Sequence, residues 1–196
     1  MLRAVRHLPR HLDARLQYQR PCVTMATQAG EKDYKFGPWT VHAYEVFAAT
    51  ELSYAFVNLK PVVPGHVLVS PARVVPRFND LTAAEVTDMW LLAQRVGAAV
   101  ERHFKASSLT LAIQDGPLAG QTVPHVHIHV LPRRAGDFEK NDEVYDAIDA
   151  SAKQAVPLLQ DKEAGKDSNL DLDKPRVNRT IEEMTAEAKE LRAYFT

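Results

Sequence analysis

The chain has 196 residues, of which 45% are apolar and 25% charged, and its formal net charge is −1 at pH 7. These values are typical of a globular chain, and a charge so close to zero excludes a global field that would attract nucleic acid or an anionic membrane. The single cysteine, Cys22, excludes an internal disulfide and fits a reducing compartment, while no apolar run approaches the roughly 18 residues of a membrane-spanning helix.

The N-terminal stretch is basic, and we expect residues 1–33 to lie outside the fold. Before Met25 it contains five arginines, interleaved with leucine and valine, but only one acidic residue, Asp13. This composition is typical of an organelle transit segment, although serine is absent, and a disordered basic tail without an address is the alternative. The expected location is therefore cytoplasmic, or mitochondrial or otherwise organellar, depending on whether the leader is used.

From Tyr34 the chain contains several strand-like segments. They are rich in β-branched and aromatic residues, as strands are. A Pro/Gly turn, KPVVPGH, separates two of them and predicts a hairpin. The segments lie at residues 41–46, 53–59, 66–70, 109–113 and 125–132.

The clearest helix follows Thr82. Thr82 and Glu85 form a capping box, which predicts a helix N-terminus. Apolar residues then recur at steps of three and four, which predicts one buried face and an end near His103 or Phe104. The residues of this face are Val86, Met89, Trp90, Ala93, Val96, Val100 and Phe104.

The C-terminal third alternates between helical and polar segments. We expect a short helix within residues 141–155 and a mobile charged loop over residues 156–178, which lack periodicity. A second capping box, Thr180 with Glu183, opens a C-terminal helix. Meandering strands with separate helices predict an α+β fold with a mainly antiparallel sheet. We therefore expect a core domain at 34–155 on which the C-terminal segment, 179–196, packs.

Three histidines alternate with branched aliphatic residues in HVHIHV, residues 125–130. Alternate side chains of a strand share one face, so His125, His127 and His129 should point away from the core. Neighbouring rings would lie roughly 6.6 Å apart and the outer two roughly 13 Å. Such a row suits an extended anion, such as a chain of phosphates, better than one metal ion. A half-exposed strand rich in histidine, and a zinc site using two of the rings, are the alternatives.

The row also predicts a reaction. An imidazole that attacks phosphorus must be neutral, because protonation removes the lone pair. Close imidazoles disfavour one another's charged forms, so we expect lowered pKa values. A backbone carbonyl would hold the second ring nitrogen and fix the tautomer, and water could cleave the phosphorylated ring in a second step.

Two glutamines flank the glycine turn that precedes the histidine row. Gln114 and Gln121 can donate to phosphate oxygens without acting as bases, and Gly116 and Gly120 let backbone N–H groups approach an anion. Without the histidines, these would be ordinary polar turn residues.

HVHIHVLP resembles the signature of the histidine triad (HIT) superfamily, and the chain is similar to its fragile histidine triad branch, a family of diadenosine triphosphate hydrolases. The resemblance covers residues 36 to 196 apart from the loop after about residue 155. The matching stretches are FGPW, LSYAFVNLKPVVPGHVLVSP, RFNDLTAAEV, SLTLAIQDGPLAGQTVPHVHIHVLPRRAGDFEKND and EEMTAEAKELRAYF.

The resemblance implies a HIT-like α+β fold and a homodimer formed through the long helix and a neighbouring strand. It implies hydrolysis of bis(5′-adenosyl) triphosphate to AMP and ADP through a covalent adenylyl-histidine. His127 would be the nucleophile, and His125 and His129 would position it and contact phosphate. Gln121 would support the α-phosphate and the leaving group.

The resemblance also implies substrate contacts outside the row. Asn58 would lie near the ribose, His66 near the triad and Gln114 near phosphate, while apolar residues 56–59 would line an adenine pocket. A divalent cation, Mg²⁺ or Mn²⁺, would arrive with the substrate and would not occupy a protein site. Adenosine 5′-phosphosulfate is a second expected substrate, giving AMP and sulfate. The alternatives are a slow nucleotide-liganded signalling or interaction module, and a broader adenylyl hydrolase or transferase.

Overall fold

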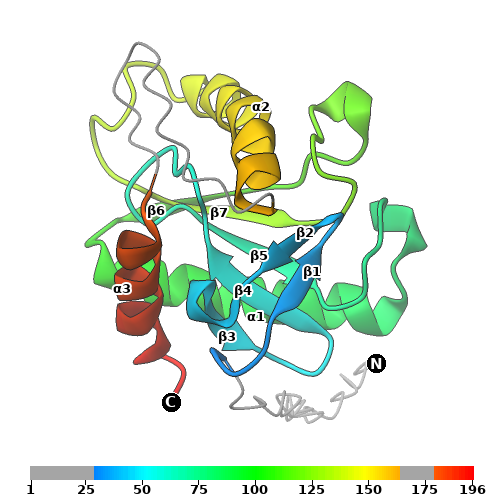
Figure 1. Cartoon of the computed structure of the whole chain (residues 1–196). Helices are drawn as coiled ribbons and strands as arrows, with labels where there is room; N and C mark the ends of the chain where they lie inside the picture. Colours follow the sequence, from blue (N-terminus) through cyan, green and yellow to red (C-terminus); the bar gives the residue numbers. More distant parts are fainter. Residues whose placement is uncertain (1–28, 164–178) are drawn as a thin grey trace, which may run out of the picture.

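The computed structural model describes residues 29–163 and 179–196, with side chains described except at 154–163 (Figure 1). The leader up to residue 28, and the part of the predicted loop from 164 to 178, lie outside the described residues. The remainder is an α+β fold, as predicted. A five-stranded antiparallel sheet has the order β3-β4-β5-β7-β6. Its strands are β3 (Val46–Ala49), β4 (Ser53–Val57), β5 (Val67–Pro71), β6 (Ser108–Ala112) and β7 (Ile128–Arg133).

Strands β4 and β5 form the predicted hairpin, with a register running from Ser53 opposite Pro71 to Val57 opposite Val67. Both faces of this hairpin are buried, which explains its unbroken apolar composition. Side chains alternate between two clusters: Ala55 and Val57 meet one, while Tyr54 and Phe56 meet the other. The sheet is therefore a central layer covered on both sides.

One face of the sheet is covered by α1 (Ala83–His103), which lies behind the sheet in Figure 1. The predicted capping box and helix end are confirmed. Thr82 Oγ1 accepts from the Glu85 N–H at 3.2 Å, and the Glu85 carboxylate accepts from the Thr82 N–H at 2.8 Å. Of the predicted face, Met89, Ala93, Val96 and Val100 are buried, whereas Val86 and Phe104 are only half-buried. Trp90 is wrongly assigned, because it is 38% exposed. Trp90 follows Met89, which is buried, and therefore points away from the sheet.

The other face is covered by a small hairpin of β1 (Tyr34–Phe36) and β2 (Trp39–Val41), seen in front of the sheet in Figure 1. The strand predicted at residues 41–46 is wrong. A 3₁₀ turn, Ala43–Glu45, separates β2 from β3. The Glu45 carboxylate accepts from the His42 N–H at 2.7 Å, and this side-chain bond closes the turn at a point where the residue composition predicted extended chain.

Two further helices complete the fold. Helix α2 (Glu143–Glu163) is longer than predicted. It includes Pro157, and residues 156–163 are helical where the sequence predicted a loop. The residues after Pro157 are mostly good helix formers, so the helix continues into a segment where the lack of periodicity predicted a loop.

Helix α3 (Ile181–Arg192) begins at the predicted capping box and buries Met184, Ala188 and Leu191 in the core. Arg192 at its end donates to three backbone carbonyls around the 3₁₀ turn, those of Ala43, Tyr44 and Val46, at 2.8, 3.2 and 2.8 Å. The C-terminal helix is thereby fastened to the start of β3.

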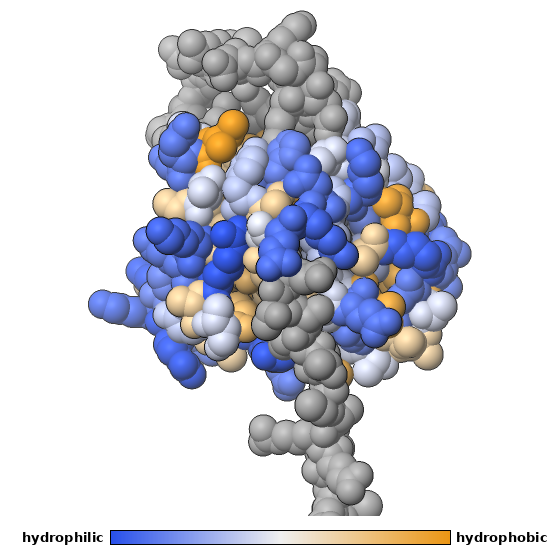
Figure 2. All heavy atoms as spheres, turned by 60° about the horizontal axis from the view of Figure 1, so that its bottom comes forward, coloured by the Kyte–Doolittle hydropathy of each residue, from blue (hydrophilic) through white to orange (hydrophobic). Residues whose placement is uncertain are grey.

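Within the described part of the chain, no helix has the length and apolarity needed to cross a bilayer. Figure 2 shows a face on which hydrophilic residues predominate and hydrophobic residues form small separate patches.

Candidate active site

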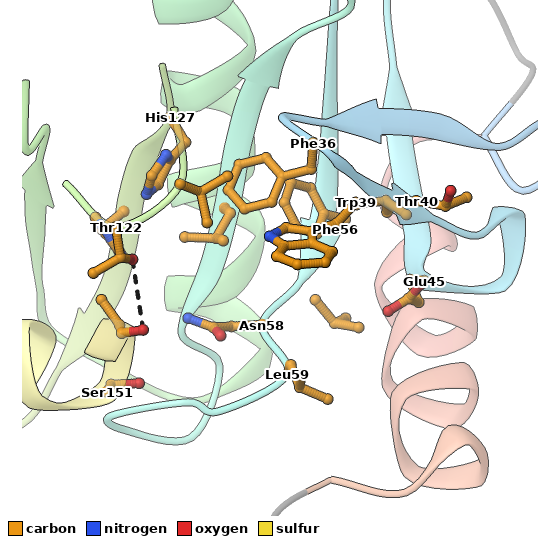
Figure 3. Close-up of a pocket in the computed structure, with 16 residues that line it drawn as sticks. Phe36, Trp39, Thr40, Glu45, Phe56, Asn58, Leu59, Thr122, His127 and Ser151 are labelled. Atoms are coloured by element: carbon orange, nitrogen blue, oxygen red, sulfur yellow. Dashed lines mark hydrogen bonds between the residues drawn. The ribbon is translucent and has the colours of Figure 1, made fainter. Parts of the chain in front are cut away.

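A cavity that is open to solvent lies between the β1–β2 hairpin, β4 and α2. His127 lies at one end of it and Glu45 at the other, with the rings of Phe36, Trp39 and Phe56 between them (Figure 3). The remaining lining residues are Thr40, Val41, Val57, Asn58, Leu59, Leu68, Thr122, Val123, His129, Ser151 and Ala152.

The strand that contains the histidines begins three residues later than predicted, at Ile128 and not at His125. Strand β7 begins at Ile128, so only His129 of the three histidines belongs to the sheet ladder. The Val126 N–H donates instead to the Val75 carbonyl at 2.8 Å, which lies outside β5. The predicted alternation nevertheless holds. Val126, Ile128 and Val130 lie in the core on the α1 side of the sheet.

All three histidines are buried on the opposite face, with exposures of 0%, 6% and 3% in chain order. The half-exposed strand that we considered as an alternative is therefore wrong. Burial of three imidazoles side by side needs compensating hydrogen bonds, since unpaired polar groups in the interior are costly.

His127 has a tautomer set by the backbone. Its Nδ1 lies 2.7 Å from the carbonyl oxygen of His125, and because a carbonyl only accepts, Nδ1 carries the proton. In the neutral ring, Nε2 then carries the lone pair. The predicted backbone clamp is confirmed, and the Phe36 ring packs edge-on against His127 at a centroid distance of 5.0 Å.

His66 and His129 form a second chain of hydrogen bonds. The Val62 N–H donates to His66 Nδ1 at 3.2 Å, so the neutral His66 ring carries its proton on Nε2. That Nε2 lies 3.0 Å from Nδ1 of His129, which must accept. The proton of His129 is therefore on Nε2, which is buried without a partner among the described residues. His129 thus presents an N–H donor beside the His127 ring, whose centroid is 4.8 Å away.

The ring of His125 is hydrogen-bonded to backbone groups through both of its nitrogens. Its Nδ1 accepts from the Gly37 N–H at 3.0 Å, and its Nε2–H donates to the Pro71 carbonyl at 3.0 Å. Both ring nitrogens are engaged in this structure, so the phosphate contact predicted for this ring stays a prediction. His125 instead holds the β1–β2 hairpin against the sheet and offers its carbonyl to His127.

The pKa values of these rings are lowered, as predicted, but the main cause is different. Burial lowers the pKa of His66 to about 3 and of His125 to about 4, with a smaller contribution from charge on His127. Burial also holds the pKa of His129 well below its ordinary value. The pKa of His127 is lowered by burial, against the opposing hydrogen bond to the His125 carbonyl. Desolvation therefore contributes more than mutual repulsion to keeping the rings neutral.

The two glutamines point to partners outside the cavity. Gln121 accepts from the Gly116 N–H at 2.8 Å and donates to the Pro76 carbonyl at 2.9 Å. Gln114 donates to the carboxylate of Asp149, on α2, at 2.5 Å. Neither glutamine lines the cavity, so their predicted contacts with substrate stay predictions.

Asn58 lines the cavity, as its predicted role near the ribose requires. Its Oδ1 accepts from the Lys60 N–H at 3.0 Å, and its Nδ2 lies 3.4 Å from the acceptor Nδ1 of His66. His66 does not line the cavity but lies behind His129, so it acts on the site through that ring.

Sequence reasoning missed the walls contributed by the β1–β2 hairpin and by α2. Phe36 and Trp39 flank the turn at Gly37, whose φ of 60° and bond to His125 bring the hairpin over the histidines. Ser151 of α2 is fastened to the Lys60 carbonyl at 2.5 Å. The two aromatic residues around Gly37-Pro38 were the available signal for an aromatic wall.

We find no group of side chains arranged as a metal site in the described part of the chain. Among those residues, no group of three His, Cys, Asp or Glu side chains is placed to hold a metal ion. Hydrogen bonds to other protein groups already occupy Nδ1 and Nε2 of His66, both ring nitrogens of His125, and Nδ1 of His129.

Comparisons with known proteins agree with this geometry. The family model described as the HIT domain matches residues 40–136. The chain is 60% identical over 162 residues to a protein of Arabidopsis thaliana named bifunctional bis(5′-adenosyl)-triphosphatase/adenylylsulfatase FHIT, covering 83% of this chain and 84% of that protein. It is 49% identical over 160 residues to the bis(5′-adenosyl)-triphosphatase of Dictyostelium discoideum, covering 82% and 91%.

A solved structure shares the fold. The diadenosine triphosphate hydrolase of Plasmodium falciparum, in complex with Cyclomarin A, is similar with a TM-score of 0.62 and 31% identity. That similarity covers 83% of this chain and 84% of the other.

Proposed function

The chain belongs to the HIT family, in its fragile histidine triad branch, and from that premise we propose that it hydrolyses bis(5′-adenosyl) triphosphate to AMP and ADP. One observation carries the proposal: His127 is buried at the end of a cavity lined by aromatic rings, with its Nδ1–H held by the His125 carbonyl. Nε2 is then the nitrogen left to attack. The names of the similar proteins give the substrate class.

The reaction proceeds in two displacements at the α-phosphorus. His127 Nε2 forms a bond to phosphorus while the bond to the bridging oxygen breaks, and ADP leaves. A water molecule then attacks the adenylyl-His127, the phosphorus–nitrogen bond breaks, and AMP leaves while the water gives up a proton. Positive charge that develops on the ring is stabilised by the Nδ1–H bond to the His125 carbonyl.

The donor on His129 acts on the phosphate. Its Nε2–H, placed by the hydrogen bond from His66, is available to a non-bridging oxygen as charge builds there. A donor that is oriented before the reaction stabilises the transition state without reorganisation cost at that moment. Gln114 and Gln121 would join it only after exchanging their present partners.

The aromatic section of the cavity receives the base. Phe36, Trp39 and Phe56 provide flat apolar surface between His127 and the far end. Rings of this kind stack on bases at about 1–3 kcal/mol each. Asn58 lines the same cavity, and we assign it to the ribose.

The same attack explains a second substrate. Adenosine 5′-phosphosulfate has an α-phosphorus bonded to sulfate, which leaves as readily as a phosphate, so we extend the proposal to AMP and sulfate formation. The name of the Arabidopsis relative includes this activity. A divalent cation, Mg²⁺ or Mn²⁺, would accompany the polyphosphate and shield its charge.

We also propose that the chain forms a homodimer through β6 and α1. Among the described residues, β6 pairs with β7 on one side only, and Leu111 on that strand is 41% exposed. Exposed edge strands with apolar side chains favour pairing with another chain. Sedimentation equilibrium tests this: a dimer mass supports it, and a monomer at micromolar concentration contradicts it.

The test of the activity is a product analysis in ¹⁸O-labelled water. Equimolar AMP and ADP, with the label in AMP alone, support attack at the α-phosphorus. Label in ADP, or no release of AMP, would overturn the proposal. Specificity constants measured side by side for diadenosine triphosphate, diadenosine tetraphosphate and adenosine phosphosulfate then rank the substrates. A turnover far below about 1 s⁻¹ with tight binding would favour a nucleotide-liganded signalling module.

A further inference from the structure

Glu45 is a buried carboxylate in the wall of a largely apolar cavity. It is 4% exposed and is the one acidic residue among those that line the cavity. Figure 3 places it beyond the aromatic rings from His127. A carboxylate in such surroundings is costly unless donors satisfy it, and it would repel the phosphates if it lay near them. Its position at the end away from His127 removes that conflict.

The backbone around Glu45 is held firmly. The His42 N–H donates to its carboxylate at 2.7 Å, which closes the 3₁₀ turn. Arg192 donates to the carbonyls of Ala43, Tyr44 and Val46 on both sides of it, at 2.8, 3.2 and 2.8 Å. The carboxylate is therefore oriented before any ligand enters, which reduces the entropy lost on binding.

This arrangement fits the edge of a purine base. A base stacked among Phe36, Trp39 and Phe56, with its α-phosphate at His127, extends its far edge toward Glu45. A carboxylate accepts up to about four hydrogen bonds, so it can keep the bond from His42 and accept another from an exocyclic amino group. A base without that group would leave the buried charge with one donor fewer.

We propose that Glu45 selects bases that carry an exocyclic amino group, such as adenine, by accepting a hydrogen bond from that group. The inference rests on the proposed function, because it assumes that the α-phosphate is bound at His127. It concerns selection of the base and leaves the chemistry at phosphorus unchanged.

The test compares two ligands that differ by one amino group. Dissociation constants for AMP and for purine riboside 5′-monophosphate are measured by titration calorimetry on the full chain. We expect the wild type to bind AMP about 10- to 100-fold more tightly, as a hydrogen bond to a charged group implies. Glu45→Leu should bring this ratio close to one. Because both ligands are measured on the same variant, partial unfolding does not change the ratio.

Two further variants separate selection from folding. Glu45→Gln keeps a side-chain carbonyl that can accept from His42, so the turn is retained while the ratio should fall to a few-fold. Glu51→Gln removes the same charge at an exposed site in the β3–β4 turn and should leave the ratio unchanged. If the ratio stays at its wild-type value in both Glu45 variants, or if the wild type does not discriminate, Glu45 only closes the turn.

Failure of this inference is distinguishable from failure of the proposed function. A wild type that hydrolyses diadenosine triphosphate but shows no dependence of the ratio on Glu45 overturns the inference alone. A wild type that selects AMP through Glu45 but releases no products retains the inference and overturns the hydrolase. Binding of neither nucleotide overturns both.

Discussion

The histidines and the glutamines proposed for phosphate chemistry are held in different ways. His125 and His127 are bonded to backbone groups of the sheet and its hairpin, and all three triad rings are at most 6% exposed. Gln114 and Gln121 instead bond to an α2 carboxylate and to loop backbone, away from the cavity. The proposed nucleophile is therefore oriented by the fold, while the two glutamines would have to change partners to reach a phosphate.

The largest loss of activity is expected from a change at His127. His127→Asn removes the attacking nitrogen, so kcat for diadenosine triphosphate should fall by at least about 10⁴-fold. Nucleotide binding should remain within a few-fold of wild type, because the aromatic section of the cavity is unchanged. Turnover near wild type in this variant would remove His127 from its role.

His66 is expected to determine the tautomer of His129 through its hydrogen bond to Nδ1 of that ring. His66→Leu removes the donor to His129 Nδ1, so the proton of His129 is no longer directed to Nε2. We expect kcat to fall by about 10²- to 10⁴-fold, the range seen when a catalytic histidine loses its orienting partner. Ring ¹⁵N chemical shifts give a readout independent of activity. Wild-type His129 should be the Nε2–H tautomer, and an unchanged tautomer in the variant would contradict the chain of bonds.

Acid should destabilise the fold through the same histidines. Their folded-state pKa values, about 4 for His125 and about 3 for His66, lie below the ordinary value of 6.5. Between pH 6.5 and about pH 4, these histidines are protonated in the unfolded chain but stay neutral in the folded chain. The free energy of unfolding should therefore fall as pH drops through this window, by up to about 1.4 kcal/mol per pH unit for each ring.

Urea unfolding at several pH values measures this loss. In the His66→Leu variant one such ring is absent, so the slope between pH 6.5 and 4.5 should be shallower than in the wild type. Equal slopes would mean that His66 titrates in the folded state.

The smallest effect is expected on the glutamine side. Asp149→Ala removes the acceptor that now holds Gln114, together with its negative charge. KM for diadenosine triphosphate should fall by about 2- to 10-fold with little change in kcat, because one hydrogen bond no longer has to be exchanged. Asp146→Asn, which removes an exposed charge from the same helix, is the matched control. If both variants behave alike, Gln114 does not reach the substrate.

Local patterns predicted the parts of the fold that depend on neighbouring residues. The capping boxes at Thr82 and Thr180, the β4–β5 hairpin and the alternation of faces around Ile128 follow from spacing within a few residues, and all are present. The resemblance then identified His127, whose clamp is the carbonyl two residues earlier.

Features that depend on distant parts of the chain were not predictable in this way. The late start of β7 reflects a bond from Val126 to Val75, and the ring of His125 is occupied by Gly37, 88 residues away in sequence. The dominance of burial over repulsion in lowering the histidine pKa values likewise requires knowing how deeply the rings are covered. Spacing alone gives the distance between rings and not their solvation.

We propose that one imidazole nitrogen, Nε2 of His127, carries the adenylyl group between the two displacements. The most direct test is a single-turnover reaction with diadenosine triphosphate labelled on the α-phosphate, quenched in alkali, which preserves a phosphorus–nitrogen bond, and followed by peptide mass spectrometry. We expect a transient adenylyl group on His127 that appears before free AMP. Release of labelled AMP with no label on the protein at any time, or label on a different residue, would contradict the account.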